Sequence, residues 1–186
     1  MHFAALLWEP ILVSAVFVFI ASAISWTMLP FHNKEWKGLP NADQVREAIK
    51  AGSWSAGLYM FPFPPDAAAR RSPEFMAKMA EGPTGMVTIM KPGKMNMGKT
   101  MVLSLIGNVV VSFFTAYVGW HALGNGVPYL TVFRVVGCVG FMAYAFGSLQ
   151  DSIWFSVPWK TWCLRAVDAL IFGMLMGGTF GWLWPR

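Results

Sequence analysis

The sequence predicts an all-α membrane protein, a four-transmembrane-helix bundle, on two observations. Four long apolar stretches occupy residues 11–29, 101–120, 131–149 and 166–184, and each approaches the roughly 20 residues with which a helix crosses the hydrocarbon core of a bilayer. The chain of 186 residues is 56% hydrophobic and only 12% charged, whereas soluble domains carry about 25% charged residues. The four apolar stretches account for that deficit.

We divide the chain into transmembrane helix 1 (residues 1–30), an extramembrane loop domain (31–99) and transmembrane helices 2–4 (100–186), which form one membrane domain with helix 1. The first span contains an Ala-Ser-Ala sequence that resembles a signal-peptide cleavage site. No Lys or Arg precedes this span, and its apolar run continues beyond the alanines. We therefore interpret it as a retained helix.

The loop domain is predicted to form a small α/β or helical cap. N-cap residues followed by glycine stops predict helices at residues 42–51 and 73–81, with Asn41 as the cap of the first. Runs of strand-forming residues that end at prolines predict strands at 55–63 and 84–90. Alternatively, the two helices lie on the membrane surface.

The distribution of basic residues predicts the orientation. Four spans place both termini on one side, and ten of the fourteen Lys and Arg residues lie in the long loop on the other side. The positive-inside rule places that loop in the cytoplasm and the termini outside. Because the basic residues are mixed with six acids in a loop next to the membrane, the net charge of +5 does not indicate nucleic-acid binding.

The fourth span carries a stripe of small residues. Ala169, Gly173, Gly177 and Gly181 recur every four residues, so they share one helix face. Small residues at this spacing let another helix backbone approach closely. The stripe is open to two interpretations: packing inside this bundle, or a docking face for a partner or a second copy.

The second span carries polar side chains at the same spacing. Ser104, Asn108 and Ser112 lie on one face, and Asn108 is near the middle of the membrane. Lipid offers no hydrogen-bond partners, so the amide must find them within the protein. We interpret the set as a structural clamp, with a polar pathway for water, an ion or a small solute as the alternative.

Charged side chains near the span ends form two groups. Glu9 and Arg134 lie on the side of the termini, where they are able to pair. Asp151, Arg165 and Asp168 lie on the loop side. Acids at membrane depth are candidates for function. Because the interface is close, we expect Asp168, which has Arg165 and Lys160 nearby, to form a local ion pair rather than a proton relay.

No motif for a catalytic, cofactor or metal site is present, and we expect neither cofactor nor metal. His2 and His121 fall on one side of the membrane and His32 on the other, so the three cannot form a ligand set. A methionine-rich segment precedes and enters the second span. We interpret it as interfacial packing, with a Cu(I) site as the alternative; its members are Met86, Met90, Met95, Met97 and Met101.

The end of the first span has the pattern S-W-x-x-L-P-x-H at residues 25–32, followed by Y-x-x-P at 59–62 and Gly-Pro at 82–83. This resembles a family of uncharacterised bacterial four-span integral membrane proteins. The resemblance implies four spans and the bacterial inner membrane, and it implies no activity. Physically, Pro30 stops the helix and His32 enters the headgroup region, so the pattern is first a device for leaving the membrane.

Our leading hypothesis is a non-catalytic accessory or scaffold subunit that docks against a larger membrane complex. Its expected partners are the lipid bilayer and other membrane subunits or a second copy of itself. The first alternative is a small transporter or channel that acts as an oligomer and uses Asn108 and Asp168. The second alternative is a membrane-interface enzyme with its site around His32, Asp151 and Asp168.

Overall fold

The structure, a computed structural model, describes residues 2–185, apart from the side chain of His2. It contains two compact units: a membrane unit made of the residues up to Lys37 and those from Asn96 onward, and a second unit, Gly38–Met95. The four predicted long apolar helices are confirmed. Each is long and apolar enough to cross a membrane, and they run Trp8–Thr27, Met97–Leu123, Tyr129–Trp154 and Trp159–Trp182. The fold is mostly helical with one small sheet, as predicted.

In the membrane unit, the spans are α2 (Trp8–Thr27), α6 (Met97–Leu123), α7 (Tyr129–Ala145) and α9 (Trp159–Trp182). The third span continues from α7 through η2 (Phe146–Ser148) into α8 (Leu149–Trp154). Two short helices precede and follow the first span, and they are α1 (His2–Leu6) and η1 (His32–Lys34).

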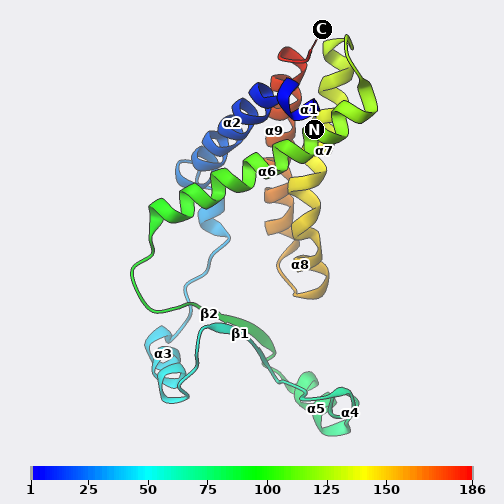
Figure 1. Cartoon of the computed structure of the whole chain (residues 1–186). Coiled ribbons are helices and arrows are strands. Elements are labelled where there is room, and N and C mark those ends of the chain that lie inside the picture. Colours follow the sequence, from blue (N-terminus) through cyan, green and yellow to red (C-terminus); the bar gives the residue numbers. More distant parts are fainter. Residues whose placement is uncertain (1, 186) are drawn as a thin grey trace. The chain divides into compact units, whose positions relative to one another are not determined.

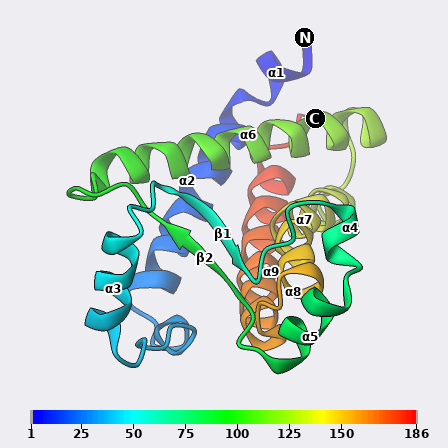
Figure 2. The ribbon, with the colours of Figure 1, turned by 90° about the horizontal axis from the view of Figure 1, so that it is seen from below.

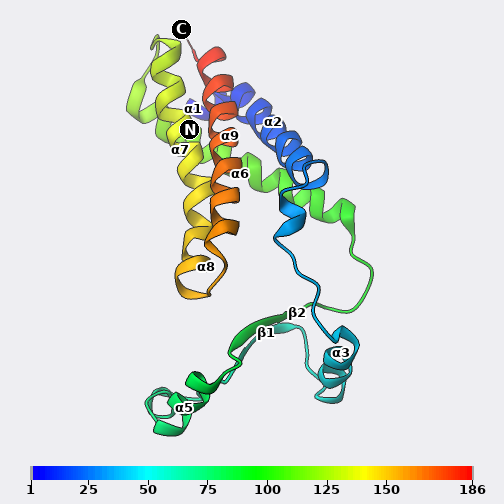
Figure 3. The same ribbon diagram turned by 180° about the vertical axis from the view of Figure 1, so that it is seen from behind.

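The four spans form a closed ring. α2 packs against α6 and α9, α6 also packs against α7, and α7 runs beside α9 (Figures 1 and 3). α6 crosses its neighbours at a steep angle, so its first turns leave the bundle (Figure 1). The interior is apolar over most of its length; its buried residues include Leu7, Val18, Val136, Met176 and Phe180.

The glycine stripe of α9 faces α7. A Cβ on Gly173 would lie 2.6 Å from the carbonyl oxygen of Gly137, and one on Gly177 would lie 2.6 Å from that of Phe133. Backbones this close leave no room for a side chain. Gly181 meets the ring of Tyr129 in the same way. The stripe is therefore covered inside the bundle.

The unit Gly38–Met95 is built on a two-stranded antiparallel ribbon, β1 (Gly57–Phe61) and β2 (Gly85–Ile89). α3 (Ala42–Ala51) lies near one end of the ribbon, and α4 (Ala67–Arg70) and α5 (Pro73–Glu81) lie near the other (Figure 2). Both predicted helices are present with the predicted bounds.

The helix caps of this unit differ. Ser72 begins α5 by accepting a hydrogen bond from the Phe75 N–H at 3.1 Å. Asn41 occupies the N-cap position of α3, but its side chain makes no capping hydrogen bond, which corrects the prediction. Its backbone is left-handed, with φ of 55°, and a capping side chain needs an extended backbone at this position.

Candidate functional site: a buried histidine between two carboxylates

His32 is the central residue of the candidate site. α2 ends at Thr27, and the chain then turns through η1, which carries the imidazole back against the last turns of α2. The ring stacks on the indole of Trp26, with the ring centroids 4.3 Å apart and the planes 6° from parallel. Only 2% of His32 is exposed. A residue expected at the headgroup boundary is therefore part of the packed interior of the membrane unit.

The two ring nitrogens of His32 face two different carboxylates. Nε2 lies 2.8 Å from Oδ2 of Asp168, and Nδ1 contacts Oε1 of Glu35. The Ser25 hydroxyl donates to Oδ1 of Asp168 at 2.7 Å and lies 3.2 Å from Nε2. Two carboxyl groups therefore flank one imidazole, each against a different ring nitrogen.

Arg165 lies beside the second carboxyl group. Its Nε lies 3.9 Å from Oε2 of Glu35, and its side chain is one-third exposed. Polar partners at both carboxyl groups matter, because an unpaired buried charge is costly. The expected partner of Asp168 was Arg165 or Lys160; instead Asp168 pairs with His32, and Arg165 approaches Glu35.

The geometry limits the chemistry of the cluster. Glu35 and Asp168 contact opposite nitrogens of one ring, so their oxygens do not converge with the ring on a common point, as metal ligands must. Ser25, His32 and Glu35 follow the order of a nucleophile, a base and an orienting carboxylate. However, the Ser25 hydroxyl is donated to Asp168. The arrangement is therefore best suited to fastening α2 and η1 to α9.

Asp151 does not join this cluster. Its backbone carbonyl accepts hydrogen bonds from the N–H groups of Phe155 and Val157, which ends α8. Of the three residues expected around an interfacial enzyme site, the structure brings together only His32 and Asp168. On the other side of the membrane, Glu9 and Arg134 are both exposed, and residues 2–185 show no ion pair between them.

A second polar group lies inside the ring of helices. Tyr144 of α7 donates its hydroxyl to Oδ1 of Asn108 at 3.0 Å, and Ser14 of α2 donates to the Ser112 hydroxyl at 3.1 Å. Nδ2 of Asn108 is buried and has no hydrogen-bond partner within the described chain. Ser104 is exposed, because the tilt of α6 carries its first turns away from the bundle.

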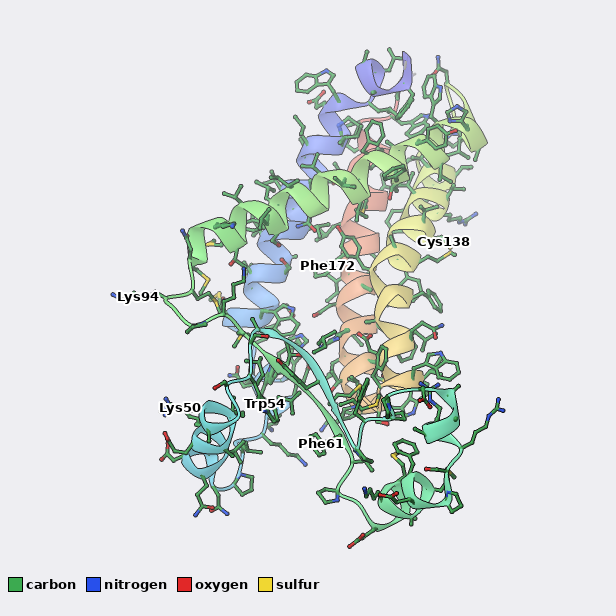
Figure 4. The ribbon with its side chains drawn as sticks, turned by 60° about the horizontal axis from the view of Figure 1, so that its bottom comes forward. Lys50, Trp54, Phe61, Lys94, Cys138 and Phe172 are labelled. Atoms are coloured by element: carbon green, nitrogen blue, oxygen red, sulfur yellow. The ribbon has the colours of Figure 1, made fainter. Side chains whose placement is uncertain are left out.

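An apolar groove of about 410 Å³ opens on the outer surface of the membrane unit. Its walls come from α2, α7 and α9, and its floor includes Gly178, where a Cβ would meet only the Tyr129 hydroxyl, at 3.7 Å. By contrast, Phe172 points into the bundle (Figure 4). The groove is lined by Phe17, Tyr129, Met174, Leu175, Gly178, Thr179 and Trp182.

Comparisons of the chain with protein-family models, with curated proteins and with solved structures find no match.

Sequence reasoning grouped His32 with Asp168 in one of its alternatives and identified Arg165 as a charged residue of this region, but it missed Ser25 and Glu35 as members of the site. The local signal was available, since Ser25 and His32 belong to one short pattern and Glu35 follows His32 by three residues. The contact between His32 and Asp168 spans 136 positions. No local pattern in a single sequence indicates a contact at that separation.

Proposed function

We propose that this protein is a non-catalytic integral membrane protein that acts as an accessory or scaffold subunit of a larger membrane complex. The observation that supports the proposal is the apolar groove over Gly178, which lies within the membrane-spanning part of α9. We propose that it receives one transmembrane helix of a partner protein. Helices associate in membranes mainly by close packing over small residues, because lipid removes the hydrophobic driving force.

The walls and floor of the groove allow the close approach of such a helix. Large side chains border it on both sides; Phe17 is 43% exposed and Trp182 is 76% exposed. Between them, the absence of a side chain at Gly178 and the short one at Thr179 leave the floor low. A partner backbone is thus able to approach the floor while its side chains pack against the walls.

The His32 cluster supports the same function by fixing the groove. Ser25 belongs to α2 and Asp168 to α9, and both helices line the groove. Hydrogen bonds to a buried charge hold the helices at a defined separation. In this proposal the cluster acts as a clamp, and it takes no part in a reaction.

The test is gentle solubilisation from native membranes, followed by sizing and mass spectrometry, with two variants run in parallel. Gly178→Leu adds a side chain to the groove, and its Cβ would come no closer than 3.7 Å to the rest of the protein. Gly107→Leu adds the same side chain to an exposed position on α6, where a Cβ would have nothing within 4 Å. We expect the wild type and Gly107→Leu to co-migrate with a stoichiometric companion that Gly178→Leu loses. A bare monomer for the wild type, or a companion that both variants retain, would contradict the proposal.

The interior polar group favours a second candidate, a small transporter or channel that acts as an oligomer. Asn108 has a buried amide nitrogen that finds no hydrogen-bond partner among residues 2–185, and Ser112 and Asp168 also lie inside the bundle. Asn108→Leu separates the candidates. A scaffold loses about 0.6–2 kcal/mol of stability with the interhelical hydrogen bond. A transporter reconstituted in vesicles loses flux and keeps its fold.

The membrane-interface enzyme remains a third candidate, because His32 and Asp168 are in contact. Asp151 lies outside the cluster, and the Ser25 hydroxyl is already donated to Asp168. These two observations favour the accessory function over a catalytic one.

A further inference from the structure

We propose that the unit Gly38–Met95 has a lipid-binding face, with which it lies on the anionic surface of the bilayer. This face, called here the ribbon face, consists of one side of the β1–β2 ribbon and the basic segment that follows it. Its apolar members are Leu58, Met60, Met86 and Met90.

The strand register places Leu58, Met60 and Met86 on one surface, and Met90 follows directly after the end of β2. Met60 is directly opposite Met86, and Leu58 is directly opposite Thr88. Opposite residues of an antiparallel pair point to the same side, as do residues two apart on one strand. Leu58 is 84% exposed and Met90 is 73% exposed. The face is therefore apolar and uncovered by the unit's own chain.

The unit has almost no core to stabilise it. Across Gly38–Met95, Pro64 is the one residue that the described chain buries. A two-stranded ribbon alone is marginally stable in water. On the opposite side of the ribbon, Trp54 stacks on Tyr59 with the ring centroids 5.0 Å apart. That opposite face is therefore partly covered by the unit's own chain. The apolar side chains of the ribbon face are removed from water only if something outside this unit covers them.

The charge next to the ribbon face is basic. In the helices of this unit, Lys50 pairs with Glu47 and Lys78 pairs with Glu74. Within residues 2–185, no ion pair involves Lys91, Lys94 or Lys99. Lys94 extends away from the chain in Figure 4. Lysines beside exposed apolar side chains match the anionic headgroups and upper acyl region of a bilayer.

Chain continuity identifies lipid as the occupant. Met95 lies two residues before Met97, the first residue of the membrane span α6. Exposed methionines continue from β2 through this connection into the span, and they are Met86, Met90, Met95, Met97 and Met101. The covalent path from the ribbon face therefore enters the membrane directly. A flexible apolar side chain such as methionine adapts to the irregular interface of lipid headgroups.

The test measures membrane depth in the full chain. Cys138 and Cys163, the two exposed free cysteines, are replaced by Ala. Single cysteines are then introduced by Leu58→Cys, Met86→Cys and, as the control on an exposed face of α3, Lys50→Cys. Each is labelled with a nitroxide in nanodiscs of phosphatidylcholine, with or without anionic phosphatidylglycerol. The measurement is the ratio of accessibility to O₂, which concentrates in the bilayer, and to a water-soluble nickel chelate.

We expect positions 58 and 86 to favour O₂ several-fold over position 50. Anionic lipid should increase that difference, and Lys91→Gln, Lys94→Gln and Lys99→Gln combined should reduce it. Equal access to the nickel chelate at positions 50, 58 and 86 would place the face in water. Low access to both reagents would place it against protein, either another part of this chain or a partner. Either result would overturn the proposal.

Discussion

The membrane unit and the unit Gly38–Met95 place their polar and apolar side chains in opposite ways. The membrane unit turns its polar groups inward: Ser14, Ser112 and Asp168 are buried, while apolar side chains cover its outside. The unit Gly38–Met95 keeps its charges outside and buries almost nothing. The difference shows that the solvent around each unit decides which side chains the fold hides. Lipid cannot hydrogen-bond, so polar groups in the spans must pair with one another.

The comparison also separates the sources of stability. In the membrane unit, backbone contacts at Gly173 and Gly177 and the hydrogen bonds of His32 join elements that are distant in sequence. In the unit Gly38–Met95, the ion pairs join residues three or four apart on a single helix. Long-range contacts define a tertiary structure, whereas pairs of the second kind stabilise only their own helix. We therefore expect substitutions in the two units to differ greatly in effect.

The largest effect is expected for His32→Leu. It leaves Glu35 and Asp168 buried without their shared partner, and breaking a buried pair in this way typically costs about 3–5 kcal/mol. The matched control is His121→Leu, which changes an exposed histidine of the same unit. Thermal unfolding in a mild detergent measures both. Equal stability of the two variants would mean that the cluster contributes nothing to the membrane unit.

A smaller but clear effect is expected for Gly177→Leu. A Cβ at this position would lie 2.6 Å from the Phe133 carbonyl oxygen and 3.2 Å from the Gly137 Cα, so α7 and α9 must separate. Overpacking of this kind costs about 1–3 kcal/mol. Gly107→Leu, at an open position of α6, should unfold like the wild type. Thermal unfolding in a mild detergent measures both variants. If both unfold at the same midpoint temperature as the wild type, α7 and α9 are not in close contact.

The smallest effect belongs to Glu74→Gln in α5. The hydrogen bond and the charge of Lys78 hold the Glu74 pKa below its ordinary value of 4.5. In turn, the hydrogen bond to Glu74 and the charge of Glu74 raise the Lys78 pKa above its ordinary value of 10.5. The pair therefore stabilises α5 above the ordinary pKa of glutamate, and that stabilisation disappears as the pH falls through the lowered value. At high pH, it is lost as the pH rises through the raised pKa of Lys78.

Circular dichroism of the full chain over pH 2–7 tests this prediction. We expect Glu74→Gln to have slightly less helix than the wild type at neutral pH and the same amount at the acid end. A wild-type helix signal for the variant at every pH would show that this exposed pair does not stabilise α5.

The four spans and much of the second unit follow from the sequence, for local reasons. Apolar length determines the spans, and the serine at position 72 and the glycine at 82 define the bounds of α5. The four-residue spacing of Gly173 and Gly177 is also visible in the sequence. The spacing does not reveal which helix the stripe contacts. A face of small residues packs equally well against the backbone of α7 and against that of a partner helix.

Only the tertiary structure decided which side chains meet. The sequence by itself determined that Asp168 lies near the membrane boundary and needs a cation, and it suggested the neighbouring Arg165. In the structure, the turn after α2 brings His32 to Asp168, and Arg165 approaches Glu35 instead. The physical reason is that apolar periodicity fixes the depth of a residue in the membrane. The rotation and neighbours of each helix depend on packing among all four spans.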